Sequence, residues 1–196
     1  MGGVVAQMSM SLDGFIADPA DGVEHLFDWY ENGPVEFVCP DPRWTFHVSE
    51  ASAGHLREGF GRAGALICGR RLFDHTNAWG GNHPLSVPVF VVTHSVPDGW
   101  PRPDKPFTFV TDGVESAVAQ AKAAAGGKDV AVASANVAQQ CLDAGLLDEI
   151  VVDLAPVLLG KGIRWFDNPG TAPVRLERYR VVEGTGVTHL YHRVLK

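Results

Sequence analysis

The sequence predicts an α/β fold with a mixed, mostly parallel central sheet, flanked by helices and followed by a C-terminal antiparallel hairpin. Three observations support this prediction. Short apolar segments alternate with amphipathic segments through the middle of the chain, which is the pattern of strand–helix–strand units. Residues 89–93 form a continuous apolar run, which suits a strand covered on both faces. Near the C-terminus, residues 174–182 and 187–194 flank a glycine-containing turn at 183–186, which predicts two antiparallel strands.

Apolar periodicity places the elements of the first half of the chain. Residues 4–11 alternate loosely between two faces and predict a central strand. Gly14 and Pro19 mark the loop that follows at 12–19. The next predictions, in chain order, are a short helix at 23–31, an irregular segment at 34–46, a helix at 49–60, a strand at 65–68 with a helical turn to 75, a loop at 77–88, the strand at 89–93, a turn-rich segment at 94–106 and a strand at 107–111.

The second half begins with a capping-box pattern, in which Asp112 stands three residues before Glu115. This pattern predicts a helix at 114–125, which the glycines at 126–127 end. No repeat, linker or low-complexity segment interrupts the order, so residues 1–196 are predicted to form a single domain. The remaining predictions are a strand at 129–133, a helix at 135–144, a strand at 147–154, a turn at 156–162 and the two strands of the hairpin.

Composition restricts the class of protein and of partner. The 196 residues suffice for one well-buried domain, and 45% hydrophobic with 20% charged residues is ordinary for a globular protein. A net charge of −7 argues against a general binder of nucleic acid or anionic membrane, so any recognition of an anion has to be local. No apolar run approaches the roughly 18 residues that a membrane span needs. Three cysteines without a metal-binding spacing suit free thiols in a reducing compartment, so the expected location is the cytoplasm.

Gly69, Arg70 and Arg71 follow the short strand at 65–68 and open the next helical turn. A helix N-terminus carries partial positive charge, so two adjacent cations there are unfavourable unless an anion neutralises them. The free N–H groups of a first helical turn also bind anions. These residues therefore predict a phosphate site. The alternative is a solvated pair of arginines at a surface turn, without a ligand.

Two more polar turns follow strands of the same predicted sheet. Ser134 stands among small residues between a strand and a helix, and Thr93, His94 and Ser95 follow another strand. In an open α/β sheet, ligands bind at the carboxyl ends of parallel strands, so three such turns at one edge predict a shared site. The alternatives are that Ser134 only caps its helix and that Thr93 and Ser95 only shape a turn.

Asp13 and Asp28 are the acids nearest the first strand and its loop. Hydride addition to a polarised C=N or C=O bond also needs a proton, which an acid near a bound heterocycle could supply. The alternatives are an ordinary Asp-Gly turn at Asp13 and a solvated helix residue at Asp28. His189 and His192 are three residues apart on a predicted strand, so they face opposite sides of the sheet, and no metal site is predicted.

Four segments together resemble a known family. They are residues 8–17 (MSMSLDGFIA), 68–74 (CGRRLFD), 141–150 (CLDAGLLDEI) and 155–162 (APVLLGKG), in that order. Over nearly its whole length the chain resembles the reductase domain of the bacterial bifunctional riboflavin-biosynthesis deaminase-reductase, which has the dihydrofolate-reductase fold. The resemblance implies an NADPH-dependent reductase of a small heterocycle, either 5-amino-6-ribosylamino-uracil phosphate-like or pteridine-like, which forms a homodimer.

The resemblance also implies where cofactor and substrate lie. Ala6, Ile16 and Ala17 would line the nicotinamide. The substrate would lie between the first strand, its loop and the next helix, near Asp13 and Asp28. Phosphate contacts are implied for three groups: Gly69, Arg70, Arg71 and Leu72 for cofactor phosphate, Thr93, His94 and Ser95 near the adenosine phosphate, and Ser134, Ala135, Asn136 and Val137 at the pyrophosphate.

One turn departs from the family pattern. Members usually carry Gly-Gly where this chain has Ala133 and Ser134, and two Cβ atoms would crowd a close approach of the pyrophosphate. The leading hypothesis is the reductase. The alternative, which this turn favours, is a small-molecule or nucleotide binding module that keeps the fold and lacks catalytic activity.

Overall fold

The computed structural model describes residues 2–167, 169–170 and 172–196. In this described part of the chain, no helix combines the length and hydropathy that crossing a membrane requires. The helices are α1 (Glu24–Phe27), α2 (Glu50–Arg62), α3 (Arg70–His75), α4 (Val114–Ala124) and α5 (Ala135–Asp143). The strands are β1 (Val4–Ser11), β2 (Phe15–Ala17), β3 (Val35–Val38), β4 (Thr45–Val48), β5 (Ala63–Gly69), β6 (Val89–Val92), β7 (Phe107–Val110), β8 (Asp129–Ala133), β9 (Glu149–Ala155), β10 (Ile163–Arg164), β11 (Leu176–Gly184) and β12 (Val187–Val194).

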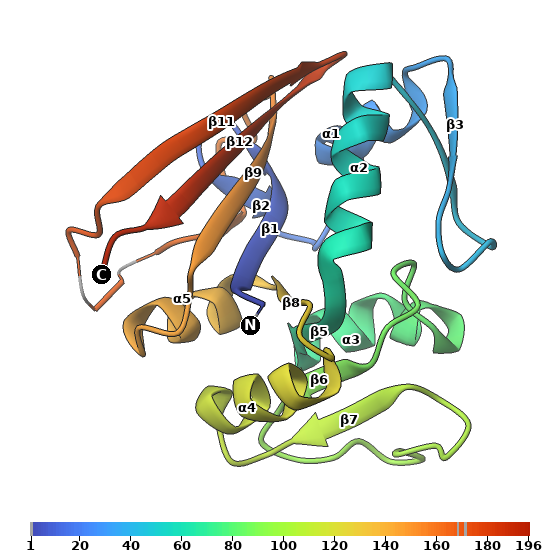
Figure 1. Ribbon diagram of the computed structural model, residues 1–196, viewed down its shortest axis with the longest axis vertical. Coiled ribbons are helices and arrows are strands. Elements are labelled where there is room, and N and C mark those ends of the chain that lie inside the picture. The colour runs from blue at the N-terminus through green and yellow to red at the C-terminus, as the bar shows by residue number, and fades with distance from the viewer. Residues whose placement is uncertain (1, 168, 171) are drawn as a thin grey trace.

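An eight-stranded sheet runs through the molecule in the order β11-β12-β9-β1-β8-β5-β6-β7 (Figure 1). Strand β1 pairs in parallel with β8 and β9, and β8, β5, β6 and β7 continue the parallel part. Strand β12 pairs antiparallel with both β9 and β11. The predicted mixed, mostly parallel sheet with a C-terminal antiparallel hairpin is therefore confirmed.

Helices cover both faces of this sheet. Side chains alternate along β1, so Val4 and Ala6 pack with residues of α4 and α5 in the largest buried cluster, whereas Val5 belongs to a separate cluster on the other face. Helix α2 contributes Ala53 and Leu56 to a third cluster, and Figure 1 shows it standing apart from α4 and α5 on the other side of β1. The space between β1 and α2 thus lies on the face away from α4 and α5.

Two segments predicted without regular structure contain strands. Strand β2 lies inside the predicted loop at 12–19, where all three of its residues are buried and pair with β10. Strands β3 and β4 form a hairpin within and just beyond the predicted irregular segment at 34–46. Phe37 and Val48 of this hairpin pack in the core under α2. These short strands form because their residues are buried against distant parts of the chain. Local periodicity does not reveal such partners.

Two predicted helices also differ from the structure. The helix predicted at 23–31 is divided into α1 and a 3₁₀ turn at Asp28–Glu31. The capping box predicted for α4 is wrong, because the N-cap position is occupied by Gly113, which has no side chain to make a cap. Its φ of 103° suits glycine, and Asp112 lies one residue too early to take this place.

Residues 77–81, predicted as loop, form a left-handed turn in which every φ is positive, from 48° at Asn77 to 101° at Gly81. Left-handed backbone is unfavourable for residues other than glycine, so this turn needs support from its surroundings. Arg43 supplies it, since its guanidinium donates to the carbonyls of residues 79, 80 and 82. Asp41 in turn holds the guanidinium through both carboxylate oxygens.

Candidate active site

Three polar turns meet at one edge of the sheet, as the sequence predicts. Strands β8, β5 and β6 are parallel neighbours, so the turns that follow them lie side by side. The Gly69 N–H donates to Ser134 Oγ over 3.0 Å, which joins the turns after β5 and β8. Arg70 Nη1 donates to the Ser95 carbonyl over 3.2 Å, which joins the turns after β5 and β6. The hydroxyl groups of these turns and the guanidinium groups of Arg70 and Arg71 therefore lie at one edge of the sheet.

Both arginines of the β5–α3 turn form ion pairs. Arg70 donates to both carboxylate oxygens of Asp74 over 2.8 Å, one helical turn further along α3. Arg71 donates to the two oxygens of Asp21 over 2.9 and 3.0 Å. The Asp74 side chain is 52% exposed and that of Arg71 is 67% exposed, so both pairs are solvated and contribute little to stability. A phosphate group could therefore replace either carboxylate at small cost.

Ser134 holds the chain in a glycine-like conformation. Its φ of 108° and ψ of 141° lie in a region that glycine alone adopts without strain. The side chain makes no capping bond to α5, so the alternative that Ser134 only caps this helix is wrong. Its hydroxyl instead bridges to Gly69. The chain thus keeps the backbone geometry of a glycine at this position and adds a hydroxyl where two turns meet.

The other residues that the resemblance assigns to the cofactor fall into two groups. Ala6, Ile16 and Ala17 are buried at 0%, 6% and 7% exposure, and Val137 is buried in the same cluster as Ala6 and Ile16. Thr93 Oγ1 donates to the carbonyl two residues later over 2.8 Å, so it does shape its turn. The half-buried or exposed residues at the edge are Leu72, Thr93, His94, Ser95, Ala135 and Asn136. Their contacts with a cofactor stay predictions.

The two predicted acids have different surroundings. Asp13 accepts hydrogen bonds from Ser11 Oγ over 2.6 Å and from the N–H groups of Leu159 and Gly160 over 3.1 and 2.7 Å. The hydrogen bond from Ser11, with those two N–H groups, lowers the pKa of Asp13. This carboxylate ties the loop after β1 to the loop after β9. Asp28 is exposed and makes no hydrogen bond or ion pair with another described residue.

A buried polar cluster lies between the sheet and α2. Its centre is Asp153 on β9, His189 on β12 and His55 on α2, each at most 3% exposed. Asp153 Oδ1 lies 2.7 Å from His189 Nδ1 and 3.0 Å from His55 Nε2. Sequence analysis identified none of these three as a site residue.

The contacts of the cluster fix the proton of one histidine. Ser52 Oγ donates to His189 Nε2 over 3.0 Å, so His189 carries its proton on Nδ1 and donates to Asp153. Gln7 Nε2 donates to Asp153 Oδ2 over 3.1 Å and lies 2.9 Å from His55 Nε2. His55 Nδ1 is hydrogen-bonded to the Tyr191 hydroxyl. The chain of contacts therefore runs from α2 through β12, β9 and β1 back to α2.

Burial and neighbouring groups set the charges of the cluster. Burial opposes a charge on Asp153, but the imidazole of His55 and the hydrogen bond from His189 hold the pKa of Asp153 below its ordinary value. Burial lowers the pKa of His189 and raises the pKa of Tyr191 to about 12. At neutral pH, Asp153 is thus a carboxylate, His189 is neutral and Tyr191 keeps its hydroxyl proton.

The same three residues could in principle ligate a metal ion, because their ligand atoms lie within 4.8 Å of one another. The rings of His55 and His189 stack, however, with centroids 3.8 Å apart and planes 13° apart. Lone pairs of nearly parallel stacked rings run side by side, so one ion cannot lie in both ring planes. The geometry favours a hydrogen-bond network.

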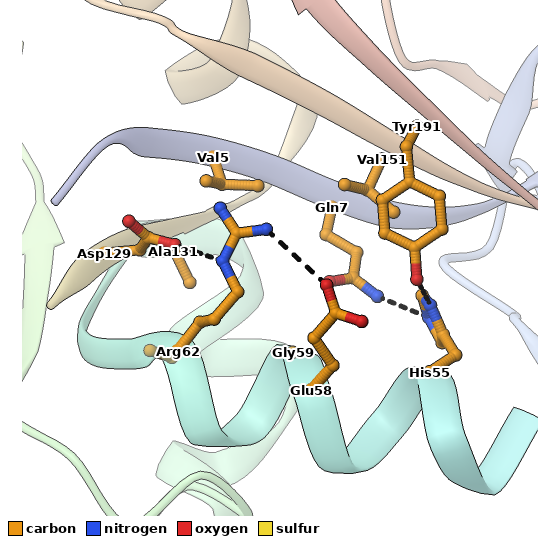
Figure 2. Close-up of a pocket in the computed structure, with 11 residues that line it drawn as sticks. Val5, Gln7, His55, Glu58, Gly59, Arg62, Asp129, Ala131, Val151 and Tyr191 are labelled. Carbon is orange, nitrogen blue, oxygen red and sulfur yellow. Dashed lines mark hydrogen bonds and ion pairs between the residues drawn. The ribbon is translucent and has the colours of Figure 1, made fainter. Parts of the chain in front are cut away.

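A small cavity of about 40 Å³ adjoins the cluster between β1 and α2 (Figure 2). Figure 2 shows Gln7, His55 and Tyr191 turned toward one another at one end of it, with Arg62 and Asp129 paired at the other. A cavity of this size holds a few water molecules and is far smaller than the pockets that bind heterocyclic ligands.

Weak signals in the sequence pointed to parts of this cluster. Asp153 is a charged residue inside an otherwise apolar strand, and His189 shares a strand face with Val187 and Tyr191. Nothing local connects them with His55, because that contact depends on how α2 packs on the sheet. His189 stacks on His55 of α2.

Solved structures with the same fold include several reductases. A putative riboflavin-biosynthesis protein from Shewanella sp. PV-4 is 23% identical, with a TM-score of 0.72 over 99% of both chains. The riboflavin-biosynthesis reductase Rib7 from Saccharomyces cerevisiae is 11% identical, with a TM-score of 0.63 over 99% of this chain and 90% of that chain. A dihydrofolate reductase from Enterococcus faecalis, complexed with NADP(H) and RAB-propyl, is 12% identical, with a TM-score of 0.61 over 100% of this chain and 98% of that chain.

At these identities the likeness shows the fold, which is therefore the dihydrofolate-reductase-like fold that the resemblance implies. A search of curated proteins finds no match. The family model of the RibD C-terminal domain matches residues 3–190, which include the three turns at the sheet edge and the three residues at the centre of the buried cluster. The chain belongs to the RibD C-terminal domain family.

Proposed function

We propose that this protein is an NADPH-dependent reductase that transfers hydride to a small heterocycle, of the riboflavin-biosynthesis reductase type. The family and the fold support an oxidoreductase. The single observation that carries the proposal is the sheet edge at which three polar turns meet around Arg70 and Arg71. The proposed substrate is 5-amino-6-ribosylamino-uracil phosphate-like or pteridine-like. The homodimer and the cytoplasmic location belong to the same proposal.

The residues at this edge fit the phosphates of a dinucleotide. The guanidinium groups of Arg70 and Arg71 can bind phosphate through paired hydrogen bonds once they leave Asp74 and Asp21. NADPH, when bound, supplies the hydride.

The surroundings of the acids restrict the source of the proton. Asp13 has a lowered pKa and three hydrogen-bond donors, so its carboxylate holds the loop after β1 in place. Asp28 is exposed, and no described residue pairs with its carboxylate. In this proposal Asp28 serves the substrate, and the buried cluster around Asp153 forms the inner wall of the space between β1 and α2.

Titration of NADPH fluorescence tests the proposal. Wild-type protein is expected to show saturable binding, and the double variant Arg70→Ala, Arg71→Ala at least about tenfold weaker binding, because two charge-assisted phosphate contacts are lost. Arg57→Ala is the matched control, since Arg57 is an exposed arginine paired with Glu50 on α2. Absence of saturable binding to wild type, or equal affinity of the double variant, contradicts the proposal.

A second candidate function is a binding module without catalytic activity. The observation that favours it is the size of the cavity between β1 and α2, about 40 Å³, beside buried side chains that fill the remaining space. Steady-state oxidation of NADPH against a panel of pteridines and aminopyrimidines separates the two functions. Binding of NADPH without turnover of any panel member supports the module, and turnover of dihydrofolate would identify folate reduction.

A further inference from the structure

The carboxylate that pairs with Arg71 comes from a distant part of the chain. Asp21 lies 50 residues before Arg71, on the loop between β2 and α1. Its Oδ1 accepts from Arg71 Nε over 2.9 Å and its Oδ2 accepts from Nη2 over 3.0 Å, so two parallel hydrogen bonds join the groups. Arg70 differs, because its partner Asp74 belongs to the same short helix. The ion pair of Arg71 therefore connects the β2–α1 loop with the proposed phosphate site.

Hydrogen bonds inside the β2–α1 loop fix the position of Asp21. Asp18 Oδ1 accepts from the N–H groups of Ala20 and Gly22 over 2.7 and 2.8 Å, and the Asp21 N–H donates to the Asp18 carbonyl over 3.2 Å. The φ of Asp21 is 67°, in the left-handed region that Asp and Asn tolerate better than most residues with a side chain. The structure of the loop thus holds this carboxylate at Arg71.

Two further carboxylates lie in this part of the chain without a cation. A Cβ on Gly22 would lie 2.6 Å from Asp18 Oδ2 and 2.9 Å from Glu24 Oε2, so both carboxylates lie beside the glycine. Neither acid forms an ion pair within the described part of the chain, where the ion pair of the loop is the one between Asp21 and Arg71. Without Arg71 the loop keeps only like charges, which repel one another.

The pair of Asp21 and Arg71 is open to solvent and to a competing anion. The Arg71 side chain is 67% exposed and that of Asp21 is 24% exposed. Such ion pairs contribute little to stability, whereas phosphate binds a guanidinium group strongly. A phosphate on the edge of Arg71 that Asp21 occupies has to displace this acid, and a phosphate on the other edge lies near a like charge. Asp21 therefore opposes the phosphate in either position.

We propose that Asp21 is an internal competitor for the cofactor phosphate, so that binding of NADPH at Arg71 releases the β2–α1 loop. This inference rests on the proposed function and adds to it a residue that lowers the affinity for the cofactor. The loop connects Ala17, assigned to the nicotinamide, with the helix before Asp28, assigned to the substrate. By reciprocal linkage, release of the loop raises the affinity for NADPH by the same factor by which NADPH favours the release.

Titration of Asp21→Asn with NADPH tests the competition. Asparagine keeps the size of the side chain and tolerates the left-handed backbone, but it carries no charge. The variant is expected to bind NADPH about two- to fivefold more tightly than wild type, which is the effect of removing one exposed ion pair. Glu50→Gln is the matched control, because Glu50 is an exposed acid paired with Arg57 on α2, and it is expected to keep the affinity of wild type.

A double-variant comparison shows whether Asp21 acts through Arg71. In the Arg71→Ala background the acid has no guanidinium group to occupy, so Asp21→Asn is expected to lose most of its effect on the affinity for NADPH. Hydrogen exchange of residues 18–23 reports on the loop itself. NADPH is expected to speed this exchange in wild type, whereas a loop that only closes on the ligand would exchange more slowly. Arg71→Ala is expected to exchange fast without ligand.

Three results overturn the inference alone: an affinity of Asp21→Asn for NADPH that is equal to or weaker than that of wild type, an equal gain in the Arg71→Ala background, or exchange of residues 18–23 that NADPH slows or leaves unchanged. If wild type binds no NADPH, the proposed function fails and the inference fails with it. The two failures are distinguishable because only the second abolishes NADPH binding to the wild-type protein.

Discussion

Ser134 Oγ accepts a hydrogen bond from the Gly69 N–H over 3.0 Å, so the turn after β8 is tied to the turn after β5. Ser134 makes this contact from a strained backbone with a φ of 108°. Glycine and alanine at this position both lose the hydroxyl, and only alanine keeps the strain. We therefore expect Ser134→Gly to be more stable than Ser134→Ala by about 1–2 kcal/mol, measured by urea unfolding. The opposite order of the two variants would show that Ser134 is not strained.

Because of the buried carboxylate of Asp153, the free energy of unfolding is expected to fall at acidic pH. Its pKa in the folded protein is lower than in the unfolded chain, so its contribution is complete above the unfolded pKa of about 4 and is lost as the pH falls toward the folded pKa. Asp153→Asn removes the charge that His189 and Gln7 donate to. We expect it to lower the free energy of unfolding at pH 7 by about 2–4 kcal/mol.

Urea unfolding of wild type and Asp153→Asn at several pH values checks this expectation. The difference between the two proteins should be constant from neutral pH down to about pH 4 and should shrink below it. Asp28→Asn, at an exposed acid without a described partner, is the control and should show no such change. A difference that stays the same at every pH would contradict the assignment of the charge to Asp153.

The order of the main elements could be predicted because its signals are local. The observed bounds of β1, β8 and β12 match the predicted strands, and α5 departs by one residue, since each carries enough apolar periodicity. Strand β2 has three residues and β10 has two, which is too short for a periodic signal. Their pairing comes from contacts between distant parts of the chain, and so does the burial of Phe37 in the β3–β4 hairpin.

Of the candidate site, too, only one part could be predicted from the sequence. The turns that contain Gly69 and Ser134 follow buried strands directly, so parallel pairing alone predicts that they meet. The carboxylates that pair with Arg70 and Arg71 could not be predicted, and neither could the meeting of Asp153 with His55.

Gly184 allows the C-terminal hairpin to close over α2. A Cβ at this position would lie 2.3 Å from Ser52 Oγ and 2.9 Å from Val187 Cγ1, closer than unbonded atoms allow. We expect Gly184→Ala to lower the free energy of unfolding by about 1–3 kcal/mol, because Ser52 must move and its hydrogen bond to His189 is disturbed. Thr185→Ala, at the exposed neighbouring residue, is the control. Equal stability of Gly184→Ala and wild type would show that the hairpin has room to shift.

Arg43 is expected to hold the left-handed turn at residues 77–81. Its guanidinium donates to two carbonyls of the turn over 3.3 Å and to the carbonyl of Asn82, just after it, over 3.2 Å, and Asp41 fixes it through two oxygens. Arg43→Ala should lower the melting temperature by several degrees and expose the turn to proteolysis. Arg43→Lys should behave similarly, because an ammonium group cannot donate in a planar fork.

The charge of Asp41 adds a dependence on pH to this prediction. The hydrogen bond from Arg43 lowers the pKa of Asp41 to about 2, so the contribution of the pair is present above about pH 4 and is lost as the pH falls toward 2. Limited proteolysis of wild type should therefore begin to cut the turn at acidic pH, whereas Arg43→Ala should be cut at neutral pH as well. Arg57→Ala removes an exposed arginine of α2 and should resist cleavage like wild type. Resistance of Arg43→Ala at neutral pH would mean that the turn keeps its left-handed backbone without the guanidinium.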